Sequence, residues 1–416
     1  MFISKQSLLI AAALIMLMRP TTAAAQSTIK VGVGDSLEAA ITEARESRAR
    51  KPGEAVVIEL AGGVHYLAAP LVLLSADSGT RSAPLEIRGA PGKTATLSGG
   101  RPLGPLDWMS WRGGIWRAKV QGPPFDLLWS DGSRLTRARY PNFDPEKRPF
   151  GGVAADATSP QRVRGWANPA GGVIHALHSA RWGGMQLAIL GKKHDGTLIL
   201  GKPTNNNRMV QMGPSENERF VENIFEELDA QGEWHLDRKG GWLYYMPPAG
   251  ERPSATGFVA SRHDNIIEIR GDAARPVHDI VISNIGFSNS APTFMKATEP
   301  LLRSDWLFSR TGAVLVEGGR RIRIRESDFT ELGGNAIVVS GYGREISIMG
   351  NAISDIGGTA IAFVGHASAV RSPLFEYHQS QPLAAIDRTR GPKNEEYPAD
   401  SMAGDNLFHD IGAIDK

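Results

Sequence analysis

A short pattern recurs near the C-terminal end of the chain at a fixed interval. The sequence "ELGGNAIVV" begins at Glu331 and "DIGGTAIAF" begins at Asp355, 24 residues later. Self-similarity with a period of roughly 20 to 50 residues is typical of a solenoid, in which each repeat buries its apolar face by stacking on its neighbours. The match continues without a gap, and the paired positions are Ile322 with Ile346, Ile324 with Ile348, Phe329 with Ile353, Leu332 with Ile356, Gly333 with Gly357, Gly334 with Gly358, Ala336 with Ala360 and Ile337 with Ile361.

Each repeat carries the alternation of a β-strand. Ile322 and Ile324 are separated by one residue, as are Ile346 and Ile348, which predicts strands with one buried face. Gly-Gly then turns the chain, a second short strand follows, and "SGYG" at residues 340–343 turns the chain again. Helical repeats would instead space apolar residues at i, i+3 and i+4. We therefore predict an all-β solenoid whose stacked coils repeat every 24 residues.

The composition is that of an ordinary globular chain. The 416 residues suffice for one large or two ordinary domains, and 47 glycines with 26 prolines suit a fold that has many turns. The chain has no cysteine, which excludes disulfides and thiolate metal sites. Any metal would therefore have oxygen or imidazole ligands.

Residues 1–25 have the features of a secretory signal peptide. Lys5 supplies a positive charge, an apolar run extends from Leu8 to Met18, and the small triplet at residues 23–25 precedes Gln26. The apolar run is too short to span a membrane, and no other segment approaches that length. We therefore expect a secreted or periplasmic protein with no membrane span.

The charge balance gives no sign of a nucleic-acid partner. Removal of Lys5 and Arg19 with the signal peptide leaves 44 of the 46 basic residues, equal to the 44 acidic ones. No basic stretch is interleaved with aromatic residues. The segment "RRIRIR" at residues 320–325 is basic, but its alternation with isoleucine indicates the solvent face of a strand.

The mature chain divides into three regions. Residues 26–105 are expected to form an N-terminal capping helix, opened by Asp35 as its cap, and the first coils. Residues 106–262 lose the repeat and hold eight of the nine tryptophans, which predicts an inserted β-rich subdomain. These tryptophans either form its own core or stack on sugar rings. Coils resume over residues 263–416, with a loop excursion at 367–403, and we expect the sequence to be truncated at its C-terminal end.

Several stretches bear a family resemblance. The repeat "NAISDIGG" at residues 351–358 resembles the right-handed parallel β-helix of the pectate-lyase-like superfamily. The segments "DSGTRSAPLEIRGAPG", "RLTRARYPNF", "GEWHLD" and "GWLYYMPP" are similar to bacterial proteins of the kind grouped in glycoside hydrolase family 141. The resemblance implies a secreted enzyme that acts on plant or microbial polysaccharide with carboxylate acid catalysis in a groove along the coils.

Three acids occupy one register position in successive coils. Glu331, Asp355 and Asp410 each precede an apolar residue and a glycine, and Asn289 corresponds to them one coil earlier. Stacked strands lie roughly 4.7–4.9 Å apart, close to the carboxyl separation of roughly 5–5.5 Å in retaining glycosidases. These acids are our catalytic candidates. Two alternatives remain open, namely turn capping by the side chains and a Ca²⁺ site; no other cofactor is indicated.

Four further residues are candidates for substrate binding. His366 and His409 are expected near the same corner, and Glu376 and His378 lie in the excursion, where they could cover the groove. Each could equally be an ordinary surface residue. Arg137, with its neighbours in "TRARYPNF", is expected to be structural.

Three functions fit these observations. The first is a glycosidase acting on a polysaccharide or oligosaccharide, the second is a noncatalytic carbohydrate-binding or adhesion protein, and the third is a polysaccharide lyase. The sequence "VGHA" at residues 364–367 lacks the companion motifs of polygalacturonases. No lipase, zinc-protease or phosphate-loop motif occurs.

Overall fold

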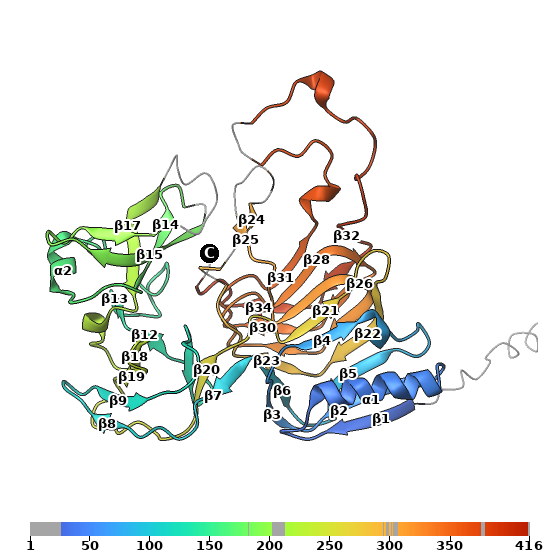
Figure 1. Ribbon diagram of the computed structural model, residues 1–416, viewed down its shortest axis with the longest axis horizontal. Helices are drawn as coiled ribbons and strands as arrows, with labels where there is room; N and C mark the ends of the chain where they lie inside the picture. The colour runs from blue at the N-terminus through green and yellow to red at the C-terminus, as the bar shows by residue number, and fades with distance from the viewer. Residues whose placement is uncertain are drawn as a thin grey trace, which may run out of the picture.

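The chain folds into two parts that lie side by side (Figure 1). The computed structural model describes residues 26–181, 183–201, 213–293, 295–296, 299–300, 302, 307–375 and 379–414. One part, which we call the parallel stack, combines the blue N-terminal strands with the orange and red C-terminal ones. The other is built by the middle segment, residues 106–262, and its structure is also mostly β. No described helix is long and apolar enough to cross a bilayer.

The parallel stack contains two large sheets in which every strand pairing is parallel. The 12-stranded sheet comprises β1 (Gln26–Val31), β2 (Ala55–Leu60), β4 (Leu71–Leu74), β5 (Leu85–Gly89), β21 (Ile267–Arg270), β22 (Val277–Ser283), β26 (Val314–Arg325), β28 (Ile337–Arg344), β29 (Ser347–Met349), β31 (Ile361–Val364), β32 (Pro398–Ala399) and β33 (Met402–Gly404). The 6-stranded sheet comprises β3 (Gly63–Tyr66), β6 (Ala95–Ser98), β23 (Gly286–Ser288), β27 (Asp328–Phe329), β30 (Ala352–Ser354) and β34 (Leu407–His409).

The strand register confirms the 24-residue repeat. Ile324 pairs with Ile348, and Ile337 pairs with Ile361. The equivalence of the last repeat is confirmed as well, because β30 pairs in register with β34. Residues that are distant in sequence therefore become neighbours on adjacent rungs, as the repeat predicted.

The glycine pair of each repeat is explained by close packing between rungs. A Cβ atom at Gly357 would lie 2.0 Å from the carbonyl oxygen of Gly333 on the next rung, and one at Gly333 would lie 2.6 Å from the carbonyl oxygen of Ser290. Real side chains do not approach backbone so closely, so both positions require glycine.

The stack turns at corners where the backbone is left-handed. The corner that carries the predicted acids has φ of 58° at Asn289, 53° at Glu331, 51° at Asp355 and 48° at Asp410. This conformation costs a side-chain-bearing residue about 1 kcal/mol, and Asn and Asp tolerate it best. Two further corners repeat the feature, one at Asn284, Glu326, Gly350 and Asp405, and one at Asp279, Arg321, Glu345 and Asp400.

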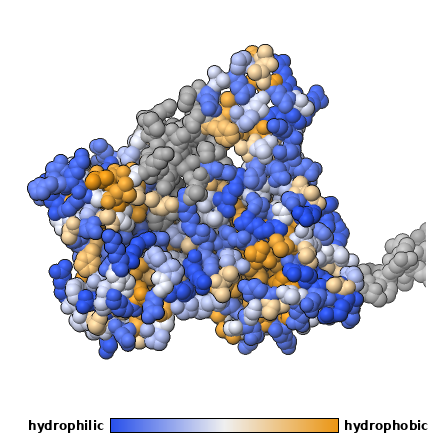
Figure 2. Space-filling model, in the orientation of Figure 1, coloured by the Kyte–Doolittle hydropathy of each residue, from blue (hydrophilic) through white to orange (hydrophobic). Residues whose placement is uncertain are grey.

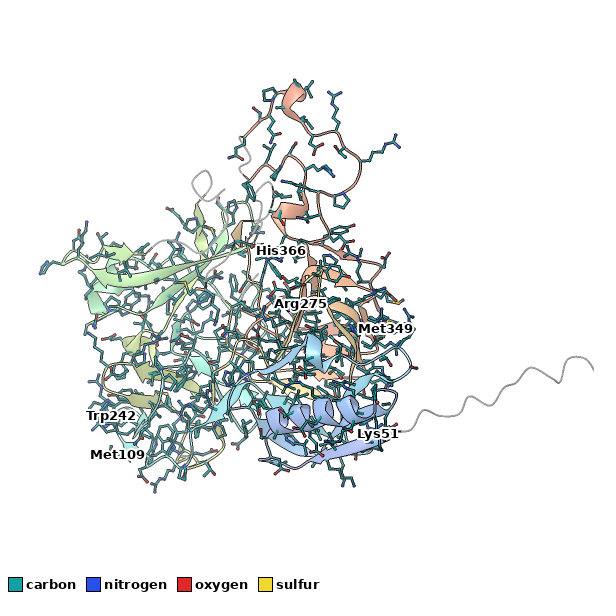
Figure 3. The ribbon with its side chains drawn as sticks, turned by 45° about the vertical axis from the view of Figure 1, so that its right-hand side comes forward. Lys51, Met109, Trp242, Arg275, Met349 and His366 are labelled. Carbon is teal, nitrogen blue, oxygen red and sulfur yellow. The ribbon has the colours of Figure 1, made fainter. Side chains whose placement is uncertain are left out.

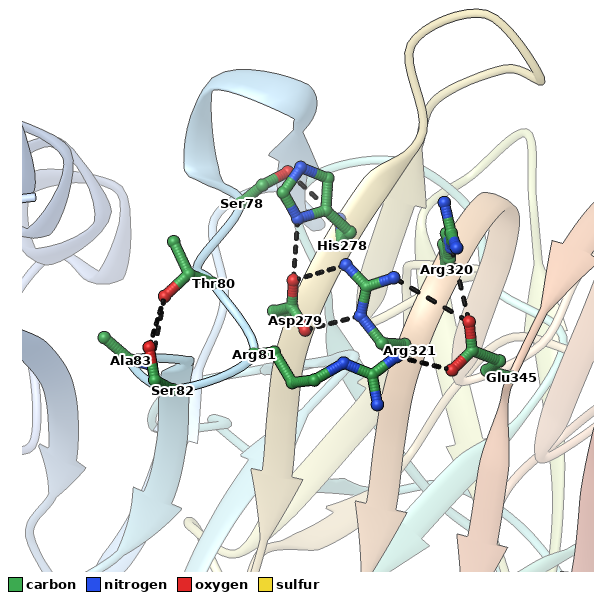
Figure 4. Close-up of polar contacts among 10 residues, drawn as sticks. All are labelled: Ser78, Thr80, Arg81, Ser82, Ala83, His278, Asp279, Arg320, Arg321 and Glu345. Carbon is green, nitrogen blue, oxygen red and sulfur yellow. Dashed lines mark hydrogen bonds and ion pairs between the residues drawn. The ribbon is translucent and has the colours of Figure 1, made fainter. Parts of the chain in front are cut away.

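At one corner the stacked side chains alternate in charge (Figure 4). Arg321 donates to both carboxylate oxygens of Asp279, at 2.7 and 2.8 Å, and His278 contacts the same carboxylate. Arg81 and Arg320 bind Glu345 on the following rung. Burial would raise the pKa of Asp279, but the hydrogen bonds from Arg321 and His278 outweigh it and lower that pKa.

The interior of the stack is filled with aliphatic side chains and one aromatic pair. Ile322, Ile324 and Ile348 are 0% exposed, and the rings of Phe287 and Phe329 stack at a centroid distance of 4.6 Å. Arg323, between two of these isoleucines, is exposed, so the basic segment is a strand with a solvent face, as expected. Hydrophilic groups cover most of the surface in view (Figure 2).

The helix α1 (Leu37–Arg50) packs on β1 and β2 at one end of the stack. A capping helix was predicted in this region, and its residues Leu37, Ile41 and Ala44 are buried. The predicted cap was wrong by one residue, because Ser36 accepts the hydrogen bond from the amide of Ala39. The carboxylate of Asp35 instead accepts from the amide of Gly32 and closes the preceding turn.

The middle segment enters and leaves between adjacent rungs. Strand β5 pairs directly with β22, and β6 pairs with β23, so the stack is continuous across the segment. The sheets of the middle segment include one flanking strand, β7 (Gly100–Pro102). Their other strands are β8 (Met109–Ser110), β9 (Trp116–Lys119), β10 (Leu128–Ser130), β11 (Ser133–Arg134), β12 (Thr136–Arg137), β13 (Arg139–Tyr140), β14 (Val173–His178), β15 (Gly184–Lys192), β16 (Leu198–Leu200), β17 (Pro214–Glu222), β18 (Glu233–Asp237), β19 (Trp242–Tyr245) and β20 (Phe258–Ser261). The segment also contains the helix α2 (Pro160–Gly165).

The tryptophans of this segment mostly form its core. Trp108, Trp129, Trp166 and Trp234 are at most 4% exposed, whereas Trp111 is 41% exposed. Trp182 lies outside the described residues. The four buried tryptophans therefore belong to the core of the segment, which was the first of the two interpretations of these residues.

Two local predictions need correction. The "SGYG" link does not end a strand, because β28 continues through it, with Gly341 at a φ of 60°. The excursion ends earlier than expected, since β32 and β33 already pair with β28 and β29. The remaining short elements are β24 (Glu299–Pro300), β25 (Leu307–Phe308) and the 3₁₀ turns Ser75–Asp77, Phe225–Glu227, Ala367–Ala369 and Leu383–Ala385.

Truncating the buried aromatic pair tests how far the stack depends on it. Phe329→Ala is expected to lower the free energy of unfolding by about 3 to 5 kcal/mol, because it leaves a cavity beside Phe287. Arg323→Ala, on the solvent face of the same chain stretch, should change it by less than about 0.5 kcal/mol. Urea unfolding of both variants measures the difference, and equal effects would contradict the assigned core.

Candidate active site

A cavity lies where the middle segment meets the parallel stack. Its volume is about 290 Å³, and residues from both parts line it. The stack contributes Glu331 and Asp355. The lining residues of the middle segment include Arg134, Arg137, Arg139, His175, Phe220, Glu222 and Trp234.

The two acids from the stack come from adjacent rungs. Glu331 and Asp355 occupy the same left-handed corner, and the residues that follow them, Leu332 and Ile356, form a parallel bridge. Adjacent rungs are about 4.8 Å apart. Glu331 is half-buried and Asp355 is exposed, so two carboxyl groups with different surroundings share one cavity.

Glu331 is held by a side chain of the middle segment. Trp129 donates its indole N–H to Oε2 of Glu331 at 2.8 Å. Burial raises the pKa of Glu331 above its ordinary value, with Asp355 acting in the same direction, although the Trp129 hydrogen bond and Arg134 partly offset the shift. A carboxyl group in this setting is biased toward the protonated form, which a general acid requires.

Arg134 brings positive charge to the two acids. It is half-buried at the end of β11, and burial lowers its pKa while the charges of Glu331, Asp355 and Glu222 raise it. The preceding strand β10 pairs with it and carries Trp129 directly opposite. The β10–β11 hairpin thus places the indole N–H of Trp129 on Glu331 and the charge of Arg134 near that acid.

A buried ion-pair network around Glu222 also lines the cavity. Oε1 of Glu222 lies 3.2 Å from Nε2 of His175 and 3.5 Å from Nη1 of Arg137. Burial would raise the pKa of Glu222, but His175, Arg137 and Arg139 outweigh it and lower that pKa to about 2. Glu222 is therefore anionic at neutral pH and holds this wall in place.

Arg139 has the contacts of a structural residue. Its guanidinium donates to the carbonyl oxygens of Pro141, Phe150 and Gly152 at 2.7 to 2.8 Å, and it lies 3.9 Å from the centroid of the Phe220 ring. These bonds fix the loop that closes one side of the cavity. Burial lowers the pKa of Arg139 to about 10.

The other predicted site residues that the structure describes, Asp410, His409 and His366, do not line this cavity. Asp410 follows Asp355 on the next rung, but its side chain is 61% exposed and pairs with His409. His366 lies at the base of the excursion (Figure 3), with Nε2 3.7 Å from Oε1 of Glu317. Glu376 and His378 lie outside the described residues. Of the predicted residues that the structure describes, Glu331 and Asp355 are the two that come together in the cavity.

The described residues do not form a recognisable site for the Ca²⁺ ion that the sequence left open. Within the part of the chain that the structure describes, no three His, Asp or Glu side chains converge as metal ligands would. The role of a metal stays an open prediction.

Sequence reasoning missed the residues that the middle segment adds. Arg134 opens the family-like stretch "RLTRARYPNF" and could have been singled out there. His175 lies on β14, a strand with several consecutive buried residues, and Glu222 ends the mostly half-buried or exposed strand β17; no motif marks either one. Only the pairing of these two strands brings them together.

The fold is that of a known hydrolase structure. No family model matches the sequence, and no curated protein matches it. A solved structure described as "Glycoside hydrolase" superimposes with a TM-score of 0.70 over 94% of this chain and 74% of the other, at 20% sequence identity. The two share a fold. A second structure, "The complex structure of XylC with xylose", covers 93% of this chain and 54% of the other at 11% identity, but its TM-score of 0.41 is too low to bear on the fold.

The charged state of Glu222 gives a pH-dependent prediction. A carboxyl whose pKa is lowered by folding stabilises the protein above its ordinary value of 4.5, and this stability is lost as the pH falls toward 2. Glu222→Gln should therefore cost about 3 kcal/mol at pH 7 and much less at pH 3. Urea unfolding at both pH values measures the gap, with exposed Glu216→Gln on the same strand as the control. A gap of equal size at both pH values would disprove the assignment.

Proposed function

We propose that this protein is a glycoside hydrolase whose catalytic pair is Glu331 and Asp355. The observation that carries the proposal is their placement one rung apart at the same corner of the stack, within one cavity that the middle segment walls off. The shared fold with a glycoside hydrolase supports it. The proposal includes a right-handed parallel β-helix for the stack and export through the N-terminal segment.

In the proposed mechanism Glu331 is the general acid. Burial biases its carboxyl toward the protonated form, so it can donate a proton to the glycosidic oxygen as the bond from that oxygen to the anomeric carbon breaks. Asp355, exposed to the cavity, attacks the anomeric carbon and forms a glycosyl ester. Glu331, now ionised, then takes a proton from a water molecule, which hydrolyses the ester and regenerates Asp355.

The spacing of the acids favours the retaining reaction. A rung separation of about 4.8 Å is near the carboxyl spacing of retaining enzymes, and it is shorter than the roughly 6.5–9.5 Å that an inverting enzyme needs to admit water between its acids. A polysaccharide lyase would use a base without a glycosyl ester, so its product would carry a new double bond.

A second candidate is a noncatalytic carbohydrate-binding protein. Trp111 is 41% exposed on the middle segment, and Arg117 lies 4.0 Å from its ring centroid and 4.5 Å from that of Trp242. Trp242 lies near the outer edge of this segment (Figure 3). Such aromatic rings can stack on sugars without any chemistry.

Substitution of the two acids tests the assignment. Glu331→Gln and Asp355→Asn should each lower kcat by at least about 100-fold, because each removes one partner of the reaction. Asp410→Asn, which changes an exposed acid outside the cavity, should retain most of the activity. Release of reducing sugar and absorbance of unsaturated products, over a panel of polysaccharides and aryl glycosides, distinguish hydrolase from lyase. Full activity in the first two variants would refute the pair.

The indole that binds Glu331 gives a second test. The hydrogen bond from Trp129 lowers the pKa of Glu331, so Trp129→Phe should raise it. Because the acid must be protonated, activity is present below this pKa and is lost as the pH rises through it. The alkaline limb of kcat/KM should therefore move to higher pH in the variant. Trp108→Phe, a buried change away from the cavity, is the matched control and should leave the limb in place.

A further inference from the structure

Among the residues that the structure describes, Arg134 forms no ion pair. Its guanidinium interacts electrostatically with Glu331, Asp355 and Glu222. None of these three carboxylates, however, lies within ion-pair distance of that guanidinium. Its Nη1 atom is buried and has no hydrogen-bond partner in that part of the chain. A buried guanidinium N–H that donates to nothing is costly, and Arg134 lines the cavity that holds the acids.

Arg137 repeats this feature in the same cavity. The residue is 5% exposed, and its Nη1 atom pairs with Asp126 and Glu222. Its Nε and Nη2 atoms are buried, and neither has a hydrogen-bond partner within the described ranges. Two guanidinium groups in one cavity wall thus keep unused donors.

Two of the acids that line the cavity are held by other groups. Glu331 accepts from Trp129, and Glu222 contacts His175 and Nη1 of Arg137. Within the described ranges, neither carboxylate forms a hydrogen bond with the unused N–H groups of Arg134 and Arg137. The planar fork of a guanidinium matches a carboxylate by two parallel charge-assisted hydrogen bonds, which are stronger than those that it forms with the hydroxyl groups of a neutral sugar.

We propose that Arg134 and Arg137 bind the carboxylate of a uronic acid, so that the substrate carries an acidic sugar beside the bond that is cleaved. This inference rests on the proposed function for the placement of that bond, but the binding of the acidic sugar does not depend on turnover. A cavity of about 290 Å³ is at the lower end of the range for small-molecule sites. The site therefore fits a terminal sugar unit.

The test compares acidic and neutral sugars in binding to the full chain. Isothermal calorimetry at low salt is carried out with glucuronate, glucose and glucose 6-sulfate on the wild type, on Arg134→Gln and on Arg323→Gln. The last variant removes the same charge from an exposed strand position outside the cavity. Circular dichroism establishes that both variants are folded. The wild type and Arg323→Gln should bind glucuronate at least about 10-fold more tightly than glucose, and Arg134→Gln should lose this preference.

Each outcome separates the two proposals. Preference for glucuronate without any hydrolysis would support the acidic-sugar site and count against the glycosidase. Hydrolysis of neutral glycosides with equal binding of glucose and glucuronate would support the glycosidase and overturn the acidic-sugar site. Tighter binding of glucose 6-sulfate than of glucuronate, or a preference that survives in Arg134→Gln, would also overturn it.

Discussion

The left-handed turn at the corners of the parallel stack is the constraint on which the rest depends. Each rung reverses direction at a residue of positive φ, and the same conformation returns at Asn289, Glu331, Asp355 and Asp410. Because the corner is repeated, the rungs share one register and their side chains stand in columns. The stability that the turns cost is offset by the aliphatic interior, where Ile322, Ile324 and Ile348 are inaccessible to solvent.

The columns acquire chemistry through contact with the middle segment. On the column of Asp279, Arg321 and Glu345 the charges alternate and neutralise each other. On the column of Glu331 and Asp355 two acids are adjacent, and the compensation comes from a separate hairpin that bears Trp129 and Arg134. The two acids of this column therefore have different surroundings. Acid catalysis needs such a difference between its two carboxyl groups.

Much of the stack could be predicted from the sequence because its contacts repeat. A fixed offset makes Ile324 the neighbour of Ile348, and the Gly-Gly pair marks where backbones touch. The cavity could be predicted only in part. Its other wall depends on contacts between residues that are far apart in the sequence, such as Trp129 and Glu331, and no sequence repeat connects these residues. The end of β28 was also missed, since glycines there bend a strand that continues.

The place where the middle segment joins the stack has a consequence for how such proteins diversify. The amide of His263, directly after the segment, donates to the carbonyl oxygen of Gly99, shortly before the segment begins, at 2.8 Å. An excursion that leaves and returns at one hydrogen bond can be exchanged for another of different length without disturbing the scaffold beneath it. The residues that the middle segment adds to the cavity can thus change while the acid column, which belongs to the stack, stays in place.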